Sequence, residues 1–213
     1  LAFTAEAVRA PLAAAMEAEL RGRLEVPADA RAIAEAFAAR GSMPEAIEAY
    51  QGAGFHELAL RCFSAAHGRF FIYYYGPEAF DRVLAGFPSS FAMQSEVIVM
   101  SLAMQSCKHG DVALARRLLA DRFGDAANDP EQVFSPRSVF SRDFRAFRVV
   151  MLIYEDIFFS DELLEQVFAL LPEFPADADL LRGSFYNSVL EYYMRCRRFA
   201  EAEDVAAQAH FHY

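Results

Sequence analysis

The sequence contains almost no lysine, and this scarcity limits what the chain binds. Lys108 is the only lysine among 213 residues, and arginine brings the basic total to 20 against 30 acidic residues. The formal net charge is therefore −10 at pH 7. Affinity for nucleic acid depends on clustered cations that neutralise phosphates. We expect that this segment does not itself bind nucleic acid.

Long apolar runs are missing as well, although 55% of the residues are hydrophobic and can build a large core. The most apolar stretch, Val97–Met104, is too short to cross a bilayer, and no signal-peptide pattern opens the sequence. The three cysteines are too few and too far apart for a disulfide framework; they are Cys62, Cys107 and Cys196. We expect a cytoplasmic protein with no membrane association, whose cysteines pack in the core.

Sequence patterns for catalysis are absent too. There is no Gly-x-x-x-x-Gly-Lys-Ser/Thr loop for phosphate, no His-Glu-x-x-His or paired Cys-x-x-Cys for metal, and no Gly-x-Ser-x-Gly elbow. His210 and His212 are two residues apart, and side chains at that spacing diverge on a helix. The sequence therefore predicts no cofactor, no metal site and no enzymatic activity.

What the sequence does contain is helical periodicity interrupted by glycine. An i, i+3, i+4, i+7 pattern precedes Gly41; it consists of Ala30, Ile33, Ala34 and Phe37. Ser42 then fits an N-cap with Glu45 closing a capping box, and Pro44 suits the first turn. Comparable segments end at Gly54, Gly68 and Pro88, and Asp111 fits an N-cap after Gly110. Short helices separated by single glycines fold back on one another as antiparallel hairpins.

Three segments need separate interpretation. Phe70–Tyr75 is aromatic enough for a strand, but we expect a helix there. Phe91–Cys107 is apolar nearly all round, which predicts one helix covered on both sides. Residues 124–143 break the rhythm and predict an irregular connection with one helical turn after Asp129-Pro130. Periodicity then resumes along one helical face, through Phe144, Phe147, Met151, Tyr154 and Phe158. Ser160 fits the N-cap of the next helix.

The spacing of large and small residues fits a tetratricopeptide frame, a helix hairpin that repeats about every 34 residues. In this frame small residues occupy the closest helix contacts, at Ala46, Ala115, Ala202, Ala206 and Ala209. We predict an all-α fold of antiparallel hairpins stacked as a tetratricopeptide-like right-handed superhelix. The alternative is an irregular helical domain.

The order of these segments resembles one family. The quoted runs are Ala32–Gly41, Pro44–Tyr50, Ala53-Gly54, His67-Gly68, Val83–Pro88, His109–Ala115 and Arg198–Glu203. Together they resemble the helical-repeat region of MalT-like, large LuxR-type transcriptional regulators, except between Gly124 and Leu163. The resemblance implies a sensor array in a bacterial regulator, with a nucleotide-binding switch before it and a helix-turn-helix after it.

This resemblance gives a domain plan. Residues 1–23 are expected to be the tail of a preceding domain or an N-terminal capping helix. Residues 24–123 form the first part of the array, 124–143 the irregular connection and 144–213 the second part. The chain begins at Leu1 and ends within an apparent helix, so we expect an excerpt of a longer polypeptide.

The expected function is non-catalytic: the segment binds a protein partner or a small-molecule effector and relays this to adjacent domains of the longer chain. The alternative is a free-standing tetratricopeptide adaptor that binds a peptide or protein. A helical enzyme is a third reading without a supporting motif.

Two clusters are candidate binding residues. Tyr73, Tyr74 and Tyr75 belong to an aromatic run that forms either core or a ligand wall on a concave face, and we expect at least one of them to be partly exposed. Arg142, Arg145 and Arg148 recur every three residues as a basic ridge, which is either a solvated, ion-paired face or a partner site.

Overall fold

Every regular element in the described part of the chain, residue 15 and residues 27–212, is a helix in the computed structural model. The prediction of an all-α fold is confirmed for these residues, whereas nearly all of the predicted segment 1–23 lies outside them. The chain divides into two compact units, with the boundary between Ile98 and Val99.

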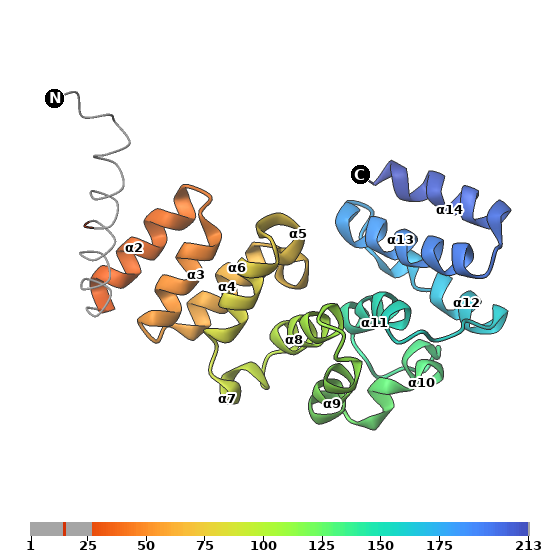
Figure 1. The fold of residues 1–213 in the computed structure, drawn as a ribbon, viewed down its shortest axis with the longest axis horizontal. Helices are drawn as coiled ribbons and strands as arrows, with labels where there is room; N and C mark the ends of the chain where they lie inside the picture. The colour runs from red at the N-terminus through yellow and green to blue at the C-terminus, as the bar shows by residue number, and fades with distance from the viewer. Residues whose placement is uncertain (1–14, 16–26, 213) are drawn as a thin grey trace. The chain divides into compact units, whose positions relative to one another are not determined.

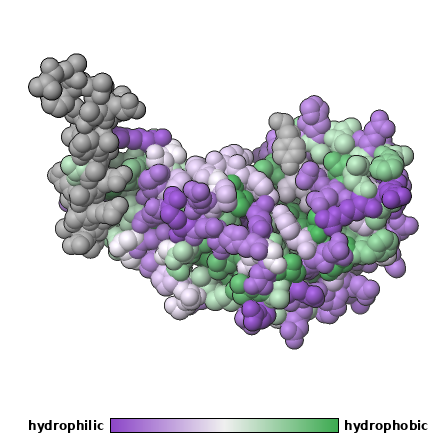
Figure 2. Space-filling model, viewed as in Figure 1, coloured by the Kyte–Doolittle hydropathy of each residue, from purple (hydrophilic) through white to green (hydrophobic). Residues whose placement is uncertain are grey.

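The surface of the described residues is mixed in character. The face viewed in Figure 2 carries hydrophobic residues among hydrophilic ones. None of the helices in residues 27–212 combines the length and the apolar character needed to cross a membrane.

The first unit is a run of short helices with neighbours in sequence packed side by side (Figure 1). Its elements are α2 (Pro27–Ala39), α3 (Met43–Gly52), α4 (His56–Ala65), the 3-10 turn η1 (Gly68–Phe70), α5 (Phe71–Tyr75), α6 (Pro77–Ala85) and α7 (Ser89–Ala92). Helix α3 packs against α2, α4 and α6. The Gln51 side chain joins α3 to α6 by donating to the Val83 carbonyl at 2.7 Å.

The core of the first unit is aromatic. Phe63 is fully buried, and its ring centroid lies 5.5 Å from that of Phe71, 6.3 Å from Phe80 and 6.2 Å from Phe87. Phe71 belongs to the run that could have passed for a strand. The prediction that this run is helical is confirmed, because packing against Phe63 and Phe80 outweighs its β propensity.

The second unit begins within α8 (Glu96–Lys108), which contains the boundary. It continues through α9 (Val112–Phe123), η2 (Asp125–Asn128), α10 (Pro130–Phe134), α11 (Arg142–Tyr154), α12 (Asp161–Phe168), η3 (Leu171–Glu173), α13 (Asp179–Arg195) and α14 (Phe199–Phe211). Helix α13 packs against both α11 and α14, while α10 contacts α11 and α12. The predicted helical turn after Asp129-Pro130 is confirmed as α10, whose first turn Asp129 caps by accepting from the Glu131 amide.

The prediction of a single helix over Phe91–Cys107 is wrong. The chain turns between α7 and α8, where the Ser95 amide donates to the carbonyl three residues back, at Ala92. The Ser95 hydroxyl then accepts from the Ile98 amide at 3.3 Å and caps the start of α8. A serine cap therefore interrupts an otherwise continuous apolar stretch.

One backbone turn recurs between helices in both units. In each case a residue with φ between 56° and 83° ends a helix, and the next amide donates to the carbonyl five residues before it, as in a Schellman motif. Glycine occupies the left-handed position at Gly41, Gly54 and Gly110, as predicted for helix ends, but Asp156 and Arg197 occupy it without glycine. This turn explains how short helices reverse direction within so few residues.

Side-chain capping differs between these turns. The Asp111 carboxylate accepts from the Leu114 amide at 2.8 Å, so its predicted N-cap is confirmed. Ser42 does occupy the N-cap position of α3, but its side chain accepts no hydrogen bond. The predicted capping box with Glu45 is therefore wrong: the Ser42 amide, which the Glu45 side chain would accept from in such a box, donates instead to the Phe37 carbonyl.

Four of the five predicted close-contact alanines are buried. Ala46 and Ala115 are fully enclosed and Ala202 is 3% exposed. Ala209 is also buried, whereas Ala206 is half-buried. Small residues thus occupy enclosed positions on these helices.

Replacing Ala202 with leucine is expected to lower the free energy of unfolding by about 1–3 kcal/mol, because three extra carbons overpack the α13–α14 contact. Urea unfolding followed by circular dichroism measures the loss. Ala207 on the same helix is exposed, and Ala207→Leu is the matched control, with a change within about 0.5 kcal/mol. Equal stability of the two variants would contradict the packing.

Candidate functional site

The tyrosines singled out from sequence lie in α5 of the first unit. Tyr73 is 58% exposed and Tyr74 is 54% exposed, so the predicted partial exposure is confirmed. Tyr74 stacks on His67 at a centroid distance of 4.1 Å, and Tyr75 packs against Phe71 at 4.3 Å. The cluster is therefore part core and part surface, and its role in binding stays a prediction.

The three arginines lie on α11 in the second unit, and they do not form a ridge. Arg142 and Arg145 both reach Glu173, at its carbonyl and its carboxylate respectively. Arg148 is fully buried and forms a bidentate pair with the equally buried Glu155, with both N–O distances 2.9 Å. The interpretation as one exposed basic face is wrong for Arg148, because helix periodicity turns this position into the core.

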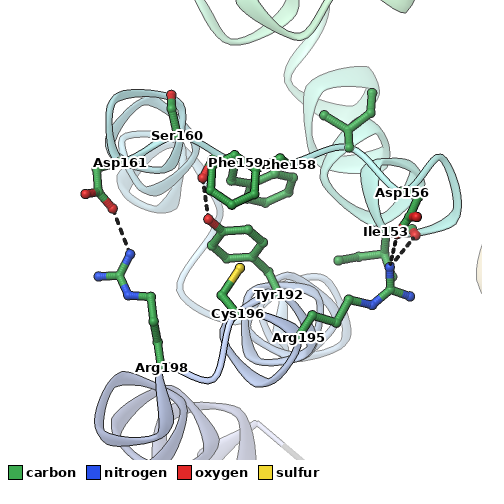
Figure 3. A pocket seen from close by; sticks show the side chains of 11 residues that line it. Ile153, Asp156, Phe158, Phe159, Ser160, Asp161, Tyr192, Arg195, Cys196 and Arg198 are labelled. Carbon is green, nitrogen blue, oxygen red and sulfur yellow. Dashed lines mark hydrogen bonds and ion pairs between the residues drawn. The ribbon is translucent and has the colours of Figure 1, made fainter.

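A pocket of about 780 Å³ lies in the second unit, between the α11–α12 connection and the α13–α14 turn. Its lining residues are Ile153, Asp156–Asp161, Tyr192, Arg195, Cys196 and Arg198 (Figure 3). The recurrent turn places both walls. At Asp156, which has a left-handed backbone, α11 ends and the irregular connection Ile157–Phe159 begins. At Arg197, which is also left-handed, the chain turns from α13 into α14. Ser160 then begins α12 by accepting from the Leu163 amide at 3.1 Å, which confirms the predicted N-cap.

Aromatic rings form the pocket wall. Tyr192 stacks on buried Phe159 at a centroid distance of 4.6 Å and meets Phe158 edge to face at 6.0 Å. Its hydroxyl donates to the Phe159 carbonyl, which fixes the connection against α13. Phe158 is 74% exposed, so a large apolar side chain faces solvent beside an aromatic wall.

Ion pairs close the two sides of the pocket. Arg195 donates to Asp156 at 3.0 Å and to Glu191 at 2.8 Å. Arg198 donates to Asp161 at 2.7 Å and to Glu201 at 2.8 Å, and it lies over the Tyr193 ring. Hydrogen bonds to Glu201 and Asp161 raise the pKa of Arg198 above its usual value. Each arginine is thus shared between two carboxylates, and the pocket lining itself balances Arg195 and Arg198 against Asp156 and Asp161.

The pocket groups are suited to binding. Burial, with a contribution from Cys196, raises the pKa of Tyr192 to about 12, so its hydroxyl stays protonated at neutral pH and keeps donating to Phe159.

Burial similarly raises the pKa of the Cys107 thiol to about 11 and raises that of Cys62. Cys107 is buried, whereas Cys62 and Cys196 are half-buried. Among residues 27–212, no group of three or more histidine, cysteine or acidic side chains is placed to hold a metal ion.

Sequence reasoning missed this pocket because it assigned Phe158 to a helical face. Helix α11 ends at Tyr154, and Phe158 lies in the connection. The sequence did contain a sign that Phe158 lies outside a helix. Ser160 fits an N-cap, so the two phenylalanines directly before it belong to the connection, and they cannot both pack on one helical face.

Proteins of known family, function or structure give no further guide to this site. A scan against protein-family models, a search of curated proteins and a search of solved structures found no match for this chain.

Proposed function

We propose that this chain is a non-catalytic binding module whose pocket beside Phe158 receives an apolar or aromatic group of a protein partner. The exposed phenylalanine carries the proposal. Burying a phenylalanine side chain contributes about 1.5–3 kcal/mol of favourable free energy. Phe158 is 74% exposed, so it gains little of this free energy from contacts within the chain.

The neighbouring geometry supports this reading over a chance exposed side chain. Interface anchors are typically aromatic groups that fill pockets with a polar rim. Here the pocket has Tyr192 as its wall and two charged pairs, Arg195–Asp156 and Arg198–Asp161, at its sides. These pairs also hold Phe158 between two anchored helix ends, so little ordering is needed on binding.

Binding of N-acetyl-phenylalaninamide, observed by NMR chemical shifts, tests the pocket. We expect saturable shifts centred on Ile157, Phe158 and Tyr192, with a dissociation constant on the order of millimolar. Phe158→Ala is expected to weaken binding at least about tenfold, because an anchor contact is worth about 2 kcal/mol or more and about 1.4 kcal/mol is tenfold. Phe211 is 83% exposed and lies outside the pocket, so Phe211→Ala is the matched control and should leave binding unchanged. Equal binding by the two variants would contradict the proposal.

The narrower proposal comes from the sequence resemblance: the module is the sensor array of a MalT-like regulator, with tetratricopeptide-like stacking, and relays binding to adjacent domains. The repeated glycine turns and the buried alanines support it. The alternative is a free-standing adaptor. Flanking sequence separates them, since the regulator requires a Gly-x-x-x-x-Gly-Lys-Ser/Thr loop before the array and a helix-turn-helix after it.

A further inference from the structure

We infer that the partner segment is extended and basic, with a lysine or arginine next to the apolar side chain that enters the pocket. This inference rests on the proposed function. It follows from a second hollow of about 600 Å³ that shares Ile157, Phe158 and Ser160 with the pocket. Phe158 therefore lies between two hollows, and a single chain passing over it reaches both.

The second hollow is lined by acidic side chains, so its charge is opposite to that of a basic segment. Asp129, Glu131 and Glu162 line it, and no lysine or arginine is among its lining residues in the described part of the chain. Hydrogen bonding to Gln132 lowers the pKa of Asp129, so this carboxyl is an anion at neutral pH. The groups that line this hollow therefore lack a cation of their own.

Hydrogen-bonding capacity points the same way. A third hollow of about 440 Å³ shares Glu162 and Gln166 and adds Glu165 and Glu173, with Arg145 already paired to Glu173. Carboxylates accept hydrogen bonds, and lysine and arginine supply several donors with positive charge.

Phe158 lies between the pocket that receives the apolar group and the acidic hollow that favours a cation. An apolar residue of the partner contacts Phe158 and Tyr192 on the pocket side, and a neighbouring cation lies near the other side of Phe158. A cation over an aromatic face is itself favourable. An acidic segment would instead place its carboxylates against Asp129, Glu131 and Glu162 in the second hollow, so charge decides the occupant.

Two pools of fluorescein-labelled nonapeptides test the inference, each with a central phenylalanine. The flanks are drawn from lysine, arginine, serine and glycine in one pool, and from aspartate, glutamate, serine and glycine in the other. Fluorescence anisotropy at 50 mM salt is expected to show at least about tenfold tighter binding of the basic pool. That preference should shrink at 500 mM salt, where charges are screened.

The charge-reversed variant Glu131→Lys/Glu162→Lys is expected to weaken the basic pool at least about tenfold and to leave N-acetyl-phenylalaninamide binding within about twofold. Glu203→Lys/Asp204→Lys makes the same charge change at exposed positions of α14 outside the hollows and should have a much smaller effect. If the pools bind equally, or if both double variants weaken the basic pool alike, the basic partner is ruled out while the pocket stands. If Phe158→Ala changes neither the amide nor the basic pool, the proposed function fails as well.

Discussion

Glu155→Ala is expected to lower the free energy of unfolding by about 3–5 kcal/mol, the largest effect of any single charge removal we expect. The Arg148 and Glu155 side chains are 0% and 1% exposed and joined by two hydrogen bonds. The guanidinium cannot lose its proton to escape burial, and its Nε atom already lacks a partner. Alanine at position 155 therefore leaves an uncompensated cation in the core.

Urea unfolding followed by circular dichroism measures this loss. Glu191 pairs with Arg195 at the surface, where both side chains are 46% exposed, so Glu191→Ala should cost no more than about 1 kcal/mol. The double replacement Arg148→Met/Glu155→Leu should recover most of the stability, because apolar residues of similar size often replace a buried pair at no cost. A loss below about 1 kcal/mol for Glu155→Ala would show that water reaches the pair.

Phe63→Ala is expected to lower the free energy of unfolding of the first unit by about 3–5 kcal/mol. The ring lies among Phe71, Phe80 and Phe87. Those three come from α5, α6 and the residues after α6, so they cannot all close the resulting cavity. Amide hydrogen exchange in α4 and α6 reports this unit directly, and protection there should fall.

Tyr73→Ala is the matched comparison for Phe63→Ala, because it removes a ring of the same unit that is 58% exposed. Its effect should stay within about 0.5 kcal/mol. If both replacements lower protection equally, Phe63 does not hold the core in the way its burial indicates.

Much of the fold was predictable because glycine and capping residues mark helix ends locally. Gly41, Gly54 and Gly110 all adopt positive φ, and periodicity between such points identified most of the helices. The turns at Asp156 and Arg197 have the same backbone without glycine. The sequence places a helix end at Arg197, but neither residue marks the left-handed position as plainly as glycine does, although aspartate adopts it more often than most side chains.

The candidate site was less predictable, because it depends on where a helix stops. An i, i+3, i+4 pattern continues through Tyr154 to Phe158, although the helix ends between them. Arg148 shows a related difficulty: a spacing of three residues equally describes an exposed stripe and one that turns into the core. Its partner Glu155 lies seven residues away, a spacing that places both side chains near one helical face but does not say whether that face is exposed or buried.

The recurrent turn also bears on how the chain folds. Three residues join the helices of the pairs α2–α3, α3–α4 and α13–α14, and the most extensive packing falls between these consecutive helices. Contacts between near neighbours in sequence close short loops, and chains dominated by such contacts reach the native state in microseconds to milliseconds. Each of these hairpins can therefore form from contacts within one short stretch of the chain.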